Sequence, residues 1–191
     1  MTISDYSKYL IDRLESLQID FDKLACEFLN CIARGNSIWI MGNGGSAGTA
    51  EHFETDLSYV KGGSLLPKIK VSALTSNSSL LTAIGNDIGF ENIFSHQLSR
   101  KSVPGDLCVV ISASGNSENL IRAISFAKEH SLLSIGLLGF DGGKLEKLVD
   151  FAAVVRTKVG EYGPVEDIHL AICHELSSRI LTELLKKGFK R

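Results

Sequence analysis

The chain has 191 residues, of which 44% are hydrophobic and 22% charged, and its formal net charge is −2. This length and balance fit one globular domain with a sizeable core. A charge so close to zero excludes a broad electrostatic surface for nucleic acid or anionic membrane, so any bound phosphate must be held by local groups.

The start of the chain is polar with a helical pattern, unlike a secretion signal, and we expect a cytoplasmic protein. No apolar run approaches the length needed to span a membrane. The cysteines form no CxxC pair, which favours buried free thiols in a reducing compartment. They are Cys26, Cys31, Cys108 and Cys173.

Two amphipathic helices are predicted first. Apolar side chains of the first helix recur at helical spacing: Tyr6, Leu10, Leu14 and Leu17. The second helix has the same pattern: Phe21, Leu24, Phe28 and Ile32. We expect this second helix to begin after Asp20, a good N-cap residue, and to end at Gly35.

Short apolar runs then alternate with helical stretches. The runs span 38–41, 69–74, 107–112, 132–138 and 151–156, and a long final helix is predicted over about 165–187. The runs are rich in Val, Ile and Leu without clean alternation, as in strands that are buried on both faces. This order predicts an α/β fold, a parallel sheet with helices on both faces.

The segment Gly42-Asn43-Gly44-Gly45-Ser46 follows the first predicted strand and precedes a helix over 47–59. Glycines allow the backbone to approach a ligand closely, and a helix N-terminus favours an anion. In parallel sheets, ligands bind beyond the carboxyl ends of the strands. The segment is therefore a candidate ligand loop, although a plain strand-to-helix turn has a similar composition.

A serine-rich segment follows the third predicted strand, and a helix is expected from near Glu118. The segment is Ser112-Ala113-Ser114-Gly115-Asn116-Ser117. Its hydroxyls and backbone N–H groups suit the oxygens of a phosphate monoester, and the alternative is a serine-rich helix cap. Two such loops at one sheet edge favour a phosphorylated ligand.

After the second strand, the segment 75–79 should open a helix that ends at Gly85-Asn86-Asp87. Asn86 and Asp87 could hold sugar hydroxyls. The alternative is that these residues only terminate the helix.

His52 and Asp56 are four residues apart on the helix after the first loop, so they share a face. Glu166, His169 and His174 lie on the last helix, where Glu166 and His174 can point the same way. These imidazoles and carboxylates could bind a divalent metal or act as general acid and base. A surface ion pair between His52 and Asp56 is the alternative.

Six motifs occur in a fixed order along the chain. They are Gly42-Asn43-Gly44-Gly45-Ser46; His52-Phe53; Gly85-Asn86-Asp87-Ile88-Gly89-Phe90; Ser112-Ala113-Ser114-Gly115-Asn116-Ser117; Asp141-Gly142-Gly143; and Glu166-Asp167-Ile168-His169 with His174. In this order they resemble the phosphoheptose isomerases of the sugar isomerase (SIS) superfamily. The resemblance runs from about the first residue to the end of the chain.

The resemblance implies a flavodoxin-like five-stranded parallel sheet flanked by helices, in a single SIS domain over 1–191. It also implies a homotetramer with active sites at subunit interfaces, in which the helices of 1–35 pack between subunits. The family reaction converts sedoheptulose 7-phosphate to D-glycero-D-manno-heptose 7-phosphate through a cis-enediol. The product serves the synthesis of nucleotide-activated heptose for surface polysaccharide.

The family's functional residues carry over to matching positions of this chain. The phosphate would be bound by the serine loop, with Ser112, Ala113, Ser114 and Ser117. The sugar would be lined by Asn43, Gly44, Gly45, Ser46, Asn86, Asp87 and Glu166. One divalent metal per site, zinc in the family, would be held by His52, Asp56, Glu166 and His174. Asp56 would be the base, also contacting substrate, and His174 its acid–base partner.

The chain departs from the better-known family pattern at five positions. Asp56 replaces a glutamate that acts as base and ligand, and Glu166 replaces a glutamine ligand. Ala113, Gly163 and Val60 replace a threonine, an aspartate and an arginine. Because the exchanges at 56 and 166 keep a carboxylate and add ligand charge, they indicate a retuned metal site.

Two other functions stay open. A non-catalytic SIS module would bind a sugar phosphate or a protein as a regulator, and another isomerase would act on a different phosphosugar. The presence of His174 favours an enzyme, whereas the exchanges at Ala113, Gly163 and Val60 leave the sugar open.

Overall fold

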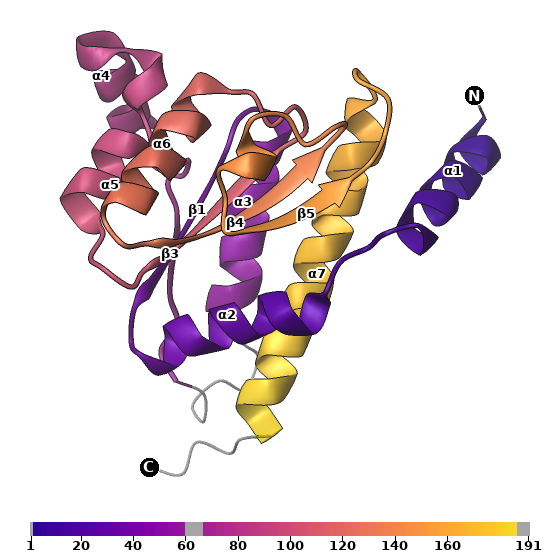
Figure 1. Ribbon diagram of the computed structural model, residues 1–191, viewed down its shortest axis with the longest axis horizontal. Coiled ribbons are helices and arrows are strands. Elements are labelled where there is room, and N and C mark those ends of the chain that lie inside the picture. Colours follow the sequence, from indigo (N-terminus) through magenta and orange to yellow (C-terminus); the bar gives the residue numbers. More distant parts are fainter. Residues whose placement is uncertain (1, 60–66, 187–191) are drawn as a thin grey trace.

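The computed structural model describes residues 2–59 and 67–186 (Figure 1). Its centre is a five-stranded sheet in the order β2-β1-β3-β4-β5, and every neighbouring pair is parallel. The strands are β1 (Ser37–Gly42), β2 (Lys70–Ala73), β3 (Leu107–Ser112), β4 (Leu133–Gly139) and β5 (Phe151–Val155). The predicted parallel α/β fold is therefore confirmed, and its order is the flavodoxin-like one.

Helices cover both faces of the sheet (Figure 1). One face packs against α2 (Phe21–Ala33), α3 (Gly45–Ser58) and α7 (Tyr162–Lys186). The other packs against α4 (Ser78–Ile88), α5 (Ser95–Lys101), α6 (Glu118–Glu129) and η3 (Leu145–Lys147), and η2 (Phe90–Asn92) lies against α4 and α6. The central strand β3 is buried at all six positions, which explains its continuous apolar run.

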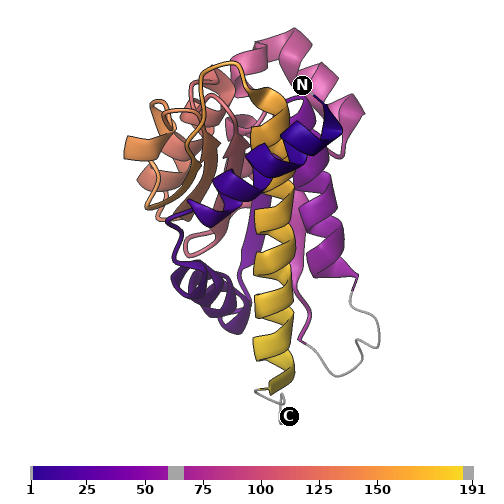
Figure 2. The same ribbon diagram turned by 90° about the vertical axis from the view of Figure 1, so that its right-hand side faces the viewer.

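The first helix, α1 (Ile3–Glu15), lies across the start of α7, outside the two layers (Figure 2). None of its residues is buried, and it ends before Leu17, which is thus not part of the predicted helix face. Two phenol–carboxylate bonds attach it: Tyr6 Oη donates to Asp167 Oδ2 at 2.5 Å, and Tyr9 Oη donates to Glu161 Oε2 at 2.6 Å.

Several predicted boundaries shift. Asp20 caps α2 as expected, by accepting a bond from the Lys23 N–H at 2.9 Å. The helix predicted to end at 85–87 continues to Ile88, and Gly89 ends it with a φ of +97°. The last helix begins at Tyr162, three residues earlier than predicted. Its expected end at 187 lies outside the described residues, as does Val60.

The expectation that all four cysteines are buried is wrong at one position. Cys26 is exposed because it lies on the outer side of α2, whereas Cys31, Cys108 and Cys173 are buried. All four are free thiols. Within the ranges 2–59 and 67–186, no helix combines the length and the apolar character that crossing a bilayer requires.

A buried carboxylate joins β1 and β3 at their amino ends. Asp106, with no exposed surface, accepts four hydrogen bonds. Oδ1 accepts from Asn36 Nδ2 at 3.0 Å and from the Ser37 N–H at 2.9 Å. Oδ2 accepts from Trp39 Nε1 at 2.8 Å and from the Val103 N–H at 3.0 Å. These bonds fix the two strands whose opposite ends carry the candidate ligand loops.

Candidate functional site

The order of the strands places a crevice between two loops. From β1 the chain continues to β2 on one side, whereas from β3 it continues to β4 on the other. Such a reversal is where flavodoxin-like folds bind ligands. The loops that flank this position are 42–46, after β1, and 112–117, after β3. They are the two loops that the sequence singled out.

The serine loop is held in shape by its own side chains. The Ser112 hydroxyl accepts a bond from the Gly115 N–H at 3.1 Å, and the Ser114 hydroxyl accepts one from the Asn116 N–H at 3.3 Å. Ser117 is the N-cap residue of α6, but its side chain makes no capping bond. Its hydroxyl and the free N–H groups of the first turn are thus available to an anion.

The Asp141-Gly142-Gly143 segment supports the serine loop from the β4 side. Gly115 has a φ of +61°, and a β-carbon on it would collide with the Gly142 carbonyl. The Leu145 N–H donates to the Gly115 carbonyl at 3.0 Å. A glycine is therefore required at 115 both by its backbone angle and by this close contact.

The loop 42–46, which we call the glycine loop, contacts α7 near the start of that helix. Gly45 begins α3, and a β-carbon there would collide with the Glu166 carboxylate. Ser46, also predicted to line the sugar, is buried, with 5% of its surface exposed. Asn43 is bonded to Asn119 on α6, so the glycine loop and the serine loop are directly linked.

Two imidazoles and a carboxylate meet where α3 packs against α7. His52 Nε2 and His174 Nε2 are 3.0 Å apart. Asp56 Oδ1 lies 3.6 Å from His52 Nε2, and Asp56 Oδ2 lies 3.8 Å from His174 Nε2. Both histidines are exposed and Asp56 is half-buried. We call these three residues the His–Asp cluster.

The His–Asp cluster fits a divalent metal. Its ligand atoms lie within 4.8 Å of one another. Two imidazole ligands of one tetrahedral zinc ion lie about 3.3 Å apart, from Zn–N bonds of about 2.05 Å, close to the observed separation. Asp56 Oδ2 is buried and has no hydrogen-bond partner among the described atoms, as expected of an oxygen with an unfilled partner.

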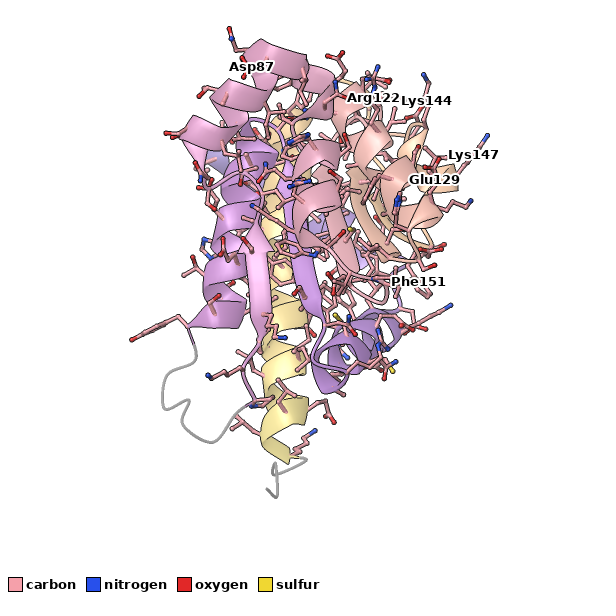
Figure 3. All side chains as sticks on the ribbon, turned by 90° about the vertical axis from the view of Figure 1, so that its left-hand side faces the viewer. Asp87, Arg122, Glu129, Lys144, Lys147 and Phe151 are labelled. Atoms are coloured by element: carbon pink, nitrogen blue, oxygen red, sulfur yellow. The ribbon has the colours of Figure 1, made fainter. Side chains whose placement is uncertain are left out.

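Other predicted site residues fall elsewhere. Glu166, whose carboxylate packs on Gly45, is not part of the His–Asp cluster. Ala113 is a buried residue of the serine loop, with 6% of its surface exposed. Asn86 and Asp87 are exposed in the last turn of α4, where the Asn86 amide donates to Asp87 Oδ1 at 2.9 Å. Asp87 points outward at one end of the molecule (Figure 3).

His169 is separate from the His–Asp cluster. It is fully buried on α7, and its Nε2 lies 3.0 Å from the Leu138 carbonyl oxygen. Burial lowers the pKa of His169 to about 4, so its imidazole is neutral at physiological pH. A neutral ring with Nε2 protonated can donate to that carbonyl.

Sequence reasoning missed two residues at the site. Asn119 is almost fully buried and bonds to Asn43, and Tyr6 bonds to Asp167 beside Glu166. Burial and that bond raise the pKa of Tyr6 to about 12, so its phenol remains a donor. The only signals were an asparagine in the first turn of a helix and a tyrosine on an amphipathic helix, and both are common.

These features together define an α/β protein that binds phosphorylated sugars. They are the fold, the crevice between two phosphate-compatible loops and the His–Asp cluster. The sequence profile of the SIS domain matches residues 4–139. A phosphoheptose isomerase structure from Neisseria gonorrhoeae superposes with a TM-score of 0.83 at 31% identity, covering 94% of this chain and 97% of that one. One from Francisella tularensis has a TM-score of 0.84 at 27% identity, covering 94% and 98%.

The resemblance extends to curated relatives. Phosphoheptose isomerase 2 of Campylobacter jejuni is 36% identical over 167 residues, which are 85% of this chain and 80% of that protein. The phosphoheptose isomerase of Aneurinibacillus thermoaerophilus is 36% identical over 172 residues, 88% and 83% of the two chains. The chain therefore belongs to the phosphoheptose isomerase family within the SIS domain proteins.

Proposed function

We propose that the chain is an aldose–ketose isomerase that converts sedoheptulose 7-phosphate to D-glycero-D-manno-heptose 7-phosphate. The main support is the His–Asp cluster on α3 and α7, the two helices that meet at Gly45 and Glu166. The curated relatives are named phosphoheptose isomerases, and the alignments cover most of this chain and most of theirs. The product would serve the synthesis of activated heptose for surface polysaccharide.

The substrate would lie across the crevice with its phosphate on the serine loop. Ser114, Ser117 and the first N–H groups of α6 would bind the phosphate oxygens. Ser112 would shape the loop by accepting the bond from Gly115. Asn43 and the backbone of Gly44 and Gly45 would line the sugar.

Isomerisation requires a base at the carbon next to the carbonyl and a proton carrier between the two oxygens. We assign Asp56 as the base, because its Oδ2 is buried and free of hydrogen bonds. His174, whose Nε2 lies 3.8 Å from that oxygen, would carry the proton between the enediol oxygens, through Nδ1 when Nε2 holds a metal. The cis-enediol would form when Asp56 takes the proton and collapse when it returns it to the neighbouring carbon.

Zinc would be held by His52, Asp56 and His174, with Glu166 as a fourth ligand after its side chain turns from Gly45. When bound, the ion would polarise the carbonyl and stabilise negative charge on the enediolate. Asp56 has one oxygen facing each imidazole. One oxygen can therefore ligate while the other accepts the proton.

The test is incubation of the purified protein with sedoheptulose 7-phosphate, with and without zinc, followed by NMR. We expect conversion that is lost in Asp56→Asn and in His174→Ala, while the sugar phosphate still shifts the unfolding temperature. His96→Ala and Asp12→Asn, at exposed positions on α5 and α1, are the matched controls. No conversion by the parent protein under any metal condition would refute the substrate, and activity in both cluster variants would refute the assigned roles.

We propose further that the chain forms a single domain over 1–191 and assembles as a homotetramer with interfacial sites, in the cytoplasm. The unburied α1 supports this, since Ile3, Ile11 and Leu14 on it are 81%, 52% and 41% exposed. Free thiols suit a reducing compartment. Light scattering on a gel-filtration column would give the mass, and a monomeric active protein would refute the assembly.

A further inference from the structure

We propose that Asn119 is a positioning residue for the sugar end of the site, acting through Asn43. The inference rests on the proposed isomerase function and adds a residue that does not touch the reacting carbons. Asn119 lies in the first turn of α6, two residues after Ser117. Asn43 lies in the glycine loop after β1.

The two side chains form a reciprocal pair. Asn43 Nδ2 donates to Asn119 Oδ1 at 2.9 Å, and Asn119 Nδ2 donates to Asn43 Oδ1 at 2.9 Å. Asn119 is buried, with 2% of its surface exposed, whereas Asn43 is half-buried. The arrangement survives if both amides are turned over, because each still presents one N–H and one oxygen to the other.

The pair leaves part of Asn43 free for a ligand. A carboxamide has two N–H donors and two acceptor lone pairs on its oxygen, and the pair uses one of each. The remaining N–H and lone pair of Asn43 can meet sugar hydroxyls. The terminal torsion of an unpaired asparagine is broad, so Asn119 restricts the plane in which Asn43 presents these groups. Both amides and Ser117 line one cavity of about 580 Å³.

The pair also ties the two ligand loops together across the crevice. Asn119 moves with the helix whose N-terminus faces the phosphate, and Asn43 precedes Gly44 and Gly45. On its far side the serine loop is braced by the contact of Gly115 with Gly142. A phosphate bound on one loop and a sugar lying on the other are thus held at a set separation, which is what orientation of the reacting carbons requires.

A double-mutant cycle tests the proposal. Asn43→Ala, Asn119→Ala and the double variant are made in the full chain, with Asn30→Ala at an exposed position of α2 as control. Asn119→Leu keeps the branched shape and the number of heavy atoms of the side chain while removing both bonds. We expect kcat/KM for sedoheptulose 7-phosphate to fall about ten-fold in Asn119→Ala and in Asn119→Leu. The unfolding temperature of Asn119→Leu should change by only a few degrees.

The double variant decides between positioning and independent roles. We expect it to be no slower than Asn43→Ala, because Asn119 has nothing to hold once that amide is absent. Losses that multiply to about a hundred-fold would overturn the proposal, as would full activity of Asn119→Leu. If the parent protein is inactive on the sugar, the proposed function fails separately. The same four proteins are then compared by their unfolding temperatures in inorganic phosphate. Additive effects of the two substitutions would overturn the proposed coupling of Asn43 and Asn119, and non-additive effects would support it.

Discussion

Replacing Asp106 by asparagine should destabilise the fold strongly although the side chain keeps its shape. In the native protein each carboxylate oxygen accepts two hydrogen bonds: Oδ1 from Asn36 and Ser37, and Oδ2 from Trp39 and Val103. An amide has only one oxygen. Whichever way it is turned, its NH₂ group must face two N–H donors, so two bonds are lost.

The magnitude follows from these two losses. A donor left without a partner in a buried place costs about 1–3 kcal/mol, so the two losses in Asp106→Asn should cost about 2–6 kcal/mol. That is a large part of a total stability of about 5–15 kcal/mol. In a chain of this size, 1 kcal/mol corresponds to a shift of about 2–4 °C in Tm. We therefore expect Tm to fall by roughly 4–24 °C.

The assay is denaturant and thermal unfolding of Asp106→Asn beside Asp12→Asn, an exposed aspartate of α1. Burial alone would raise the pKa of Asp106, but the four donors outweigh it and the net pKa is lowered. A carboxylate with a lowered pKa stabilises the fold above its unfolded pKa near 3.8 and loses that contribution as the pH falls through its folded pKa. The difference in unfolding free energy between the parent and Asp106→Asn should narrow at acidic pH. A variant within about 0.5 kcal/mol of the parent at pH 7 would refute the reasoning.

Three further changes have defined outcomes. Gly45→Ala should lower kcat/KM more than ten-fold, because the backbone of Gly45 would line the sugar and a β-carbon there has no room beside Glu166. The neutral His169, with its pKa of about 4, should destabilise the fold progressively as the pH falls from 6.5 towards 4, and His169→Gln should reduce that slope, measured by chemical unfolding. Tyr6→Phe removes the bond to Asp167 and should cost about 1 kcal/mol in thermal unfolding.

The first two changes have matched controls. Gly48→Ala adds a methyl group to the same helix at a position with nothing within 4 Å, so it should leave kcat/KM unchanged. His130→Gln, at an exposed position, should keep the parent's pH slope. Equal activity of the two alanine variants would refute the need for a glycine at position 45, and an unchanged acid slope in His169→Gln would refute the role of His169.

The strands could be predicted because burial on both faces leaves a simple pattern. The run 107–112 coincides with β3, all six residues of which are buried. The end of α4 could not be placed as well. Gly85, Asn86 and Asp87 are typical of a helix end, yet the helix continues to Ile88 because Ile84 is anchored in the core and Gly89, not Gly85, takes the positive φ.

The candidate site divides into a part that local chemistry predicts and a part that it does not. Loop composition identified both flanks of the crevice, because glycines and hydroxyls between a strand end and a helix N-terminus suit a bound anion. Helical spacing did less well, since residues eight apart are about 80° apart around a helix, and Glu166 indeed packs on Gly45 while His174 meets His52. The amide pair was beyond sequence reasoning altogether.

Asn43 and Asn119 are 76 residues apart, and the composition of the two loops does not show that these two side chains meet. Only the pairing of β1 with β3 brings the two loops together, with Gly42 beside Ile111 in the register. The Asn43–Asn119 pair thus depends on the pairing of β1 with β3. That pairing depends in turn on the four hydrogen bonds accepted by Asp106, which we call the Asp106 clamp. Weakening that clamp should therefore loosen the relation between the phosphate and the sugar loops before it abolishes either loop.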